Sequence, residues 1–266
     1  KLEAEIPDPD DLANVYWDLE FCSTEDDPAV GTAWVGESMN RFICFLINNK
    51  GEDFKAGISQ YTDVDRAIDV FIYTYFCMGT DNTAKNLLWA TYDGVKWIPC
   101  PYDLDSTWGT DWQGKTRPDY TTFTPSGSNL LFRRLLENYR DQIKLRYFEL
   151  RSGILSDENV LAQFESFIGA IPEALYKAEA AKWPLVPEQG RDDLAQIRDF
   201  LAQRGAFLDA WFSGVDEELA EHVATAEVET RVWLGVAGVL RLTYHLSEGN
   251  SVCSTLIGTE DIVQGS

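Results

Sequence analysis

The segment from residue 59 to residue 79 constrains the fold most, because its pattern fits a single buried helix. In SQYTDVDRAIDVFIYTYFCMG the apolar side chains recur at helical spacing. The apolar face consists of Val64, Ile68, Phe71, Ile72 and Tyr75. Thr62 or Asp63 is suited to cap the start of this helix, and Gly79 is suited to end it.

A hairpin pattern follows the helix directly. NLLWATYDGVKWIPC has two aromatic-rich arms around Asp93-Gly94, a pair that favours a type I′ turn. Trp89 and Trp97 could stack on a base or sugar, but packing in the core of the hairpin explains them better. The second arm leads into PYDLD, and a loop rich in Gly, Ser and Thr is expected over residues 106–128.

The rest of the chain predicts a short strand, more helices and a β-rich end. VYWDLEF, residues 15–21, alternates polar and apolar side chains after an acidic lead-in that we expect to be extended. Helices are expected for ESMNRFICFLINN, NLLFRRLLENYRDQIKLRYFELRSG, SDENVLAQFESFIGAI and RDDLAQIRDFLAQRGAFLDAWF, with Ser156 or Asp157 as a cap and Pro172 as a break. After Gly214, EVETRVWLGVAGVLRLTYHL and SVCSTLIGTEDIV are expected to be strands. We therefore expect an α+β fold.

The charge of the chain limits its partners. Its 266 residues carry a formal net charge of −22, which repels nucleic-acid backbones and anionic membranes. This charge favours cations and basic partners, and the alternative is that it only keeps the protein soluble. No apolar stretch is long enough to span a bilayer.

The cysteines and histidines do not indicate a zinc site or a catalytic triad. The five cysteines form no CxxC pair, and Cys44 and Cys77 lie in apolar runs where we expect them to be buried. The sequence does not favour a disulfide framework, but it leaves one disulfide bond as an alternative. The only histidines, His222 and His245, lie in the tail with no second His or Cys beside them.

Acidic and amide residues follow both the helix and the hairpin. Asp81 and Asn86 stand five positions apart, and Asp103 and Asp105 come after the second hairpin arm. Phosphoryl transfer from Mg-ATP uses one carboxylate to orient the acceptor hydroxyl, and an Asn and an Asp to hold the metal. The order of these elements favours a metal-phosphate site. A capped turn followed by an acidic loop is the alternative.

These motifs, YTDVD, TDNTAKN, LLWATYDGVKW and PYDLDSTWG in that order, resemble the spore coat protein H (CotH) kinase family. The resemblance extends over residues 15–213, including LLENYRDQIKLRYFELRSGILS and IRDFLAQRGAFLDAWF. It implies a protein-kinase-like fold with a mainly helical C-terminal lobe, a catalytic β-hairpin and a partial N-terminal lobe. It also implies transfer of the γ-phosphate of ATP, with Mg²⁺ or Mn²⁺, to Ser or Thr of a partner protein.

The resemblance implies a role for each candidate site residue. Asp81 resembles the catalytic Asp, while Asn86 and Asp103 resemble the metal ligands and Asp105 a further metal carboxylate. Lys85 is a candidate for binding the nucleotide, with a plain surface lysine as the alternative. Glu20 loosely matches an acidic residue at the end of the family's N-terminal lobe.

We expect three regions and keep two functions open. Residues 1–35 are expected to be the remnant of an N-terminal lobe, 36–213 a kinase-like C-lobe, and 214–266 a linker and β-rich tail. A phosphate-covering loop with its Lys is not apparent after Lys1, so that part either precedes this chain or is missing. The resemblance implies an extracellular, cell-surface, spore-coat or virion-surface location. The alternative to a kinase is a non-catalytic structural or adhesive module whose tail adds to a neighbour's sheet and supports oligomers.

Overall fold

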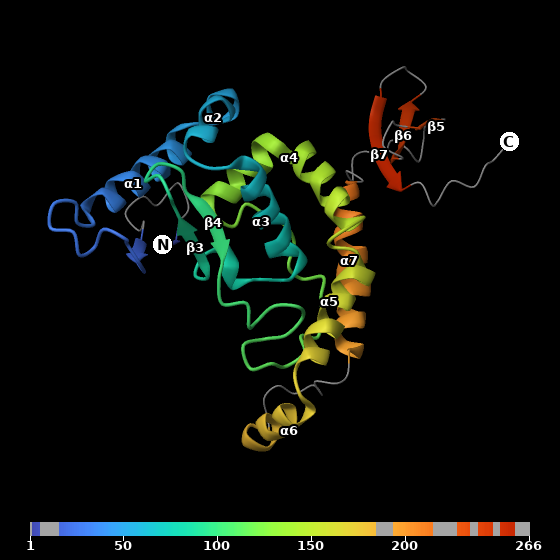
Figure 1. The fold of residues 1–266 in the computed structure, drawn as a ribbon. Helices are drawn as coiled ribbons and strands as arrows, with labels where there is room; N and C mark the ends of the chain where they lie inside the picture. The colour runs from blue at the N-terminus through green and yellow to red at the C-terminus, as the bar shows by residue number, and fades with distance from the viewer. Residues whose placement is uncertain are drawn as a thin grey trace.

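The computed structural model describes residues 2–5, 16–184, 194–214, 228–234, 239–246 and 251–258 (Figure 1). The helices are α1 (Ala33–Asn48), α2 (Gly51–Gly57), α3 (Val64–Phe76), α4 (Leu130–Arg151), α5 (Asp157–Ala170), α6 (Glu173–Lys182) and α7 (Ala195–Ser213), with 3₁₀ turns η2 (Ile58–Gln60) and η3 (Asp81–Thr83). The strands are β1 (Leu2–Glu5), β2 (Tyr16–Leu19), β3 (Leu87–Ala90), β4 (Ile98–Pro101), β5 (Val228–Leu234), β6 (Val239–Leu246) and β7 (Ser251–Gly258). The expected α+β composition is confirmed.

The hairpin forms one side of a four-stranded antiparallel sheet with the order β2-β1-β3-β4, in which β4 is an edge strand. The expected strand near residue 15 is β2, and part of the expected lead-in forms β1. The predicted type I′ turn is wrong, because β3 and β4 are joined by the longer loop 91–97. In that loop Gly94 has a φ of 71°, while Asp93 accepts hydrogen bonds from the N–H groups of Val95 and Lys96. A type I′ turn needs positive φ at both central residues.

The two helix starts predicted from capping residues are confirmed. The side chain of Asp63 accepts from the N–H of Arg66 and begins α3, and Ser156 begins α5 in the same way. Pro172 lies directly before α6. The sequence predicted the helices on either side, α5 and α7, but not α6 itself. The long α4 contains a non-helical residue, Tyr139, where two helical pieces meet at a kink.

The core forms around α3, which Figure 1 shows between the hairpin and α4. On the α4 side, the ring of Phe71 meets Phe132 edge-on with centroids 5.2 Å apart. On the sheet side, Phe42 of α1 meets Trp89 at 5.5 Å. Trp89 and Trp97 are both buried, which confirms their expected packing role.

The cysteine predictions are partly wrong. Cys77 is buried as expected, but Cys44 is exposed because it lies on the face of α1 opposite to the one that packs in the core. The cysteines whose side chains the structure describes, which are Cys22, Cys44, Cys77 and Cys100, are free thiols. His222 lies outside the described residues. Among the described helices, none combines the length and apolar character needed to cross a membrane.

Two buried arginines hold the C-terminal ends of helices. Arg134 donates to the carbonyl oxygens of Leu46 and Ile47 at the end of α1. Arg204 of α7 donates to the carbonyl oxygen of Tyr75 at the end of α3. A positive charge at this end of a helix is favourable, because the terminal carbonyls carry partial negative charge.

The β-rich end forms a sheet of its own, with the antiparallel order β5-β6-β7. The strands expected after Gly214 are confirmed, although EVETRVWLGVAGVLRLTYHL contains two of them.

Candidate functional site

The candidate site begins where α3 ends. Gly79 donates its N–H to the carbonyl of Thr74, and Met78 donates to Tyr75 at 3.4 Å, which is the Schellman pattern. The left-handed residue in this pattern is Met78, with a φ of 58°, and not the expected Gly79. Gly79 is needed for another reason: a Cβ there would lie 2.5 Å from Oδ1 of Asn82.

The turn after this helix end carries the candidate catalytic residue. Asp81 begins η3, and its carbonyl oxygen accepts from the N–H groups of Ala84 at 3.1 Å and Asn86 at 3.0 Å. The Asp81 residue is exposed, whereas Asn86 is only 7% exposed. The loop is therefore folded around backbone bonds that leave the carboxylate of Asp81 accessible to a substrate.

The fold brings Asn86 and Asp103 together. Nδ2 of Asn86 donates to the carbonyl oxygen of Asp103 at 3.3 Å, and the N–H of Tyr102 donates to the carbonyl oxygen of Asn86 at 2.9 Å. Asp103 has a φ of 51°, a left-handed conformation that is uncommon without glycine. Strained backbone of this kind is concentrated at functional sites.

The remaining two predicted residues are less tightly integrated. Asp105 lies two residues beyond Asp103, is exposed, and accepts from Oγ1 of Thr110 through its backbone carbonyl at 3.4 Å. Lys85 is exposed, and its ammonium group makes no ion pair or hydrogen bond with any described residue. The structure therefore shows no side-chain contact that tests the proposed role of Lys85.

Two asparagines that the sequence reasoning missed support this loop. Nδ2 of Asn82 donates to the carbonyl oxygens of Asn86 at 2.9 Å and Tyr102 at 2.7 Å. Asn129 donates to the carbonyl oxygen of Thr83 at 2.9 Å while it caps α4. Asn129 has a sequence signal, a cap residue before an apolar helix. No pattern identifies Asn82.

The matching family model is described as CotH kinase protein, and it covers residues 22–208. This chain belongs to the CotH kinase family. The matched stretch contains α1 to α6 and the loops with Asp81, Asn86 and Asp103, and it ends within α7. No curated protein matches the chain. The resemblance read from the sequence motifs is thus confirmed.

The oxygen groups at the candidate site of this CotH family member are of the kind that binds a divalent metal. Since Nδ2 of Asn86 is held by Asp103, its Oδ1 is the atom left to bind a cation. In the part of the chain that the structure describes, no three His, Cys, Asp or Glu side chains converge to hold a metal by themselves. Mg²⁺ is usually held by one or two carboxylates plus phosphate oxygens and water, and Asn86, Asp103 and Asp105 are the candidates that would supply the protein ligands of such an ion.

The loop after Asp105 is fixed against the end of α3. Trp108 donates its N–H to the carbonyl of Cys77 at 2.7 Å, and its ring meets that of Phe76 edge-on. Burial raises the pKa of the Cys77 thiol to about 12, so it stays protonated and is not a nucleophile. The guanidinium of Arg117 reaches Oγ1 of Thr80 at 3.4 Å, immediately before the candidate catalytic Asp.

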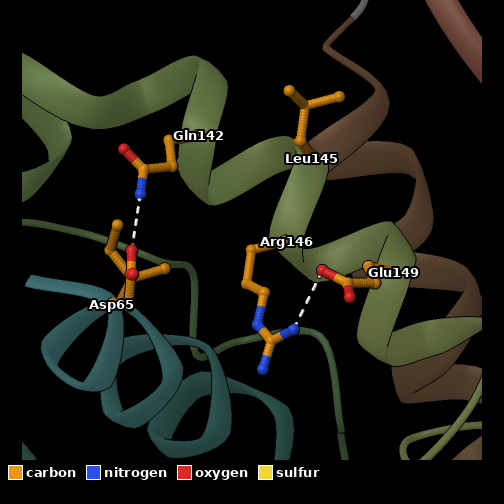
Figure 2. Close-up of a pocket in the computed structure, with 6 residues that line it drawn as sticks. Asp65, Gln142, Leu145, Arg146 and Glu149 are labelled. Carbon is orange, nitrogen blue, oxygen red and sulfur yellow. Dashed lines mark hydrogen bonds and ion pairs between the residues drawn. The ribbon is translucent and has the colours of Figure 1, made fainter.

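Two surface hollows lie at other residues. One, of about 410 Å³, lies between α3 and α4, where Asp65 bonds to Gln142 and Arg146 pairs with Glu149 (Figure 2). The other, of about 520 Å³, is lined by residues 59–65, 92, 93, 96 and 98. The polar side chains drawn in the first hollow are hydrogen-bonded or ion-paired with one another. Few of their donors and acceptors are therefore left to bind a ligand.

Changing Gly79 to Ala is expected to disturb the loop through Asn82. The added Cβ would overlap Oδ1 of Asn82, and relief of such overpacking costs roughly 1–3 kcal/mol. Gly153→Ala is the matched control, because its new Cβ would be no closer than 3.7 Å to a neighbour. Urea denaturation measures both variants. Equal stability of Gly79→Ala and the unchanged chain would contradict the prediction.

Proposed function

We propose that this chain is a metal-dependent protein kinase of the CotH type, which transfers the γ-phosphate of ATP to Ser or Thr of a partner protein. The observation that supports the proposal most is the contact between Asn86 and Asp103 beside the turn that carries Asp81. The fold proposed with it is protein-kinase-like, with 36–213 as the C-lobe, 1–35 as part of an N-lobe and 214–266 as a tail.

Each side chain has a role in the proposed transfer. Asp81 orients the acceptor hydroxyl and takes its proton, as the acceptor oxygen bonds to the γ-phosphorus and the bond from that phosphorus to the β-phosphate oxygen breaks. Asn86, Asp103 and Asp105 hold the metal, which when bound neutralises charge on the phosphates. Lys85 is proposed to contact the nucleotide. ADP and the phosphorylated protein are the products.

The partner is proposed to be a protein of a spore coat, a cell surface or another extracellular or virion surface. Membership of a family named for a spore coat protein supports this location. The net charge of −22 favours a basic acceptor sequence, because opposite charge speeds association.

Labelled ATP tests the proposed activity. The chain is incubated with γ-labelled ATP, Mn²⁺ or Mg²⁺, and Ser/Thr peptide libraries that are either basic or acidic. Label is expected on the peptides only when metal is present, and preferentially on the basic library. Mn-ATP is also expected to raise the melting temperature, because a ligand of the native state stabilises it. No transfer and no thermal shift would reject the kinase.

A non-catalytic structural module is the second candidate. The separate sheet β5-β6-β7 favours it, since β5 and β7 each have a single neighbour in this sheet and a free edge can pair with another chain. Light scattering of the whole chain and of a chain cut after Gly214 distinguishes this candidate. If this candidate is right, the whole chain assembles, the chain cut after Gly214 does not, and no label is transferred.

A further inference from the structure

Among the candidate site residues, Asp103 has the backbone conformation that needs an explanation. Its φ of 51° lies in the left-handed region, although a glycine would adopt that conformation at lower cost. The conformation of a residue is set by the two peptide groups on either side of its Cα. Whatever holds those two groups therefore determines where the Asp103 carboxylate is presented.

Both peptide groups beside Asp103 are held by asparagine side chains. Nδ2 of Asn82 donates to the carbonyl oxygen of Tyr102, in the preceding peptide, at 2.7 Å. Nδ2 of Asn86 donates to the carbonyl oxygen of Asp103, in the following peptide, at 3.3 Å. The shorter of these two bonds comes from Asn82, which has no part in the proposed metal set.

Asn82 is itself held from several directions. Its residue is only 2% exposed, and its backbone N–H donates to the carbonyl of Gly79 at 3.1 Å. Nδ2 donates a second bond to Asn86 at 2.9 Å, which ties the turn to the strand that follows it. The bare Cα of Gly79 leaves the space that Oδ1 occupies. A side chain fixed in this way can transmit its position to the Tyr102–Asp103 peptide.

We propose that Asn82 is a positioning residue, which holds Asp103 in its left-handed conformation and so directs the Asp103 carboxylate toward the metal. The statement about metal rests on the proposed kinase function, whereas the statement about the conformation of Asp103 does not. Partners that orient a metal ligand typically change metal affinity about 10- to 100-fold when they are removed.

The test is Asn82→Asp, which keeps the shape of the side chain and removes both of its N–H donors. Asn138→Asp is the matched control, because Nδ2 of Asn138 also donates to a backbone carbonyl, that of Arg134 at 2.8 Å, but within α4. Hydrogen exchange in residues 98–107, without metal, reports how firmly Asp103 is held. Titration of each folded variant with Mn²⁺ in the presence of ATP reports metal affinity.

Asn82→Asp is expected to speed exchange in residues 98–107 and to weaken Mn²⁺ binding by about 10- to 100-fold. Asn138→Asp is expected to change neither. If Asn82→Asp does not fold, Asn82→Ser is the second variant; its hydroxyl is too short to reach the carbonyl of Tyr102, so it is also expected to speed exchange. Unchanged exchange in either variant overturns the proposal. If exchange rises but the unchanged chain binds no Mn²⁺, the positioning role stands and the metal site of the proposed kinase falls.

Discussion

Replacing Asp103 by Asn is expected to lower label transfer from Mn-ATP at least ~100-fold. Metal stabilisation of the transferred phosphate is worth several kcal/mol, and each 1.36 kcal/mol corresponds to about tenfold in rate. Asn is the informative substitution because it tolerates the left-handed conformation that Asp103 adopts, with a φ of 51°. Ala would add backbone strain to the loss of the charge. The measurement is initial rate at saturating Mn-ATP.

The control for this prediction is Asp53→Asn on the exposed face of α2. It removes the same carboxylate charge from a residue outside the proposed site, so its rate is expected to equal that of the unchanged chain. A rate for Asp103→Asn within a few-fold of the unchanged chain would sink the metal assignment. A thermal shift with Mn-ATP then indicates whether nucleotide binding was lost as well.

Changing Arg204 to Met is expected to lower the free energy of unfolding by about 3–5 kcal/mol, because each buried carbonyl that loses its donor costs about 1–3 kcal/mol. The Arg204 guanidinium is fully buried and donates to the carbonyl oxygens of Tyr75, Tyr120 and Phe123. Burial lowers the pKa of Arg204 to about 10, so it is still charged at neutral pH. Met fills much of the space but removes the donor from the carbonyls of Tyr120 and Phe123, and it leaves the carbonyl of Tyr75 with the N–H of Met78 at 3.4 Å. The melting temperature should fall by roughly 10 °C.

Two further substitutions make this prediction specific. Arg198→Met, on the same helix, removes an exposed arginine that pairs with Glu165 at 2.9 Å, and is expected to cost less than ~1 kcal/mol. Arg204→Lys retains the charge but has no planar fork of donors, so an intermediate loss is expected. Urea denaturation compares all of them. If Arg204→Met and Arg198→Met cost the same, the buried guanidinium is not what holds the end of α3.

Much of the fold follows from local patterns in the sequence. The apolar spacing and the cap at Asp63 predict α3, and the two aromatic arms predict the hairpin. The fine structure of the turns does not follow in this way. Asp93-Gly94 predicts a two-residue turn, but the hairpin loop also bonds to distant parts of the chain, through Trp97 to the carbonyl of Tyr61. Such tertiary contacts override turn propensity, which acts over a few residues only.

The sequence by itself determined the order of helix, acidic turn, hairpin and acidic loop, and with it the family and the candidates Asp81, Asn86 and Asp103. Only the tertiary structure decided that Asn82 holds the peptide before Asp103 and that Arg204 holds the end of α3. The physical reason is that both side chains bind backbone carbonyls far along the chain. Every residue carries a carbonyl, so no sequence pattern specifies which of them a buried donor will reach.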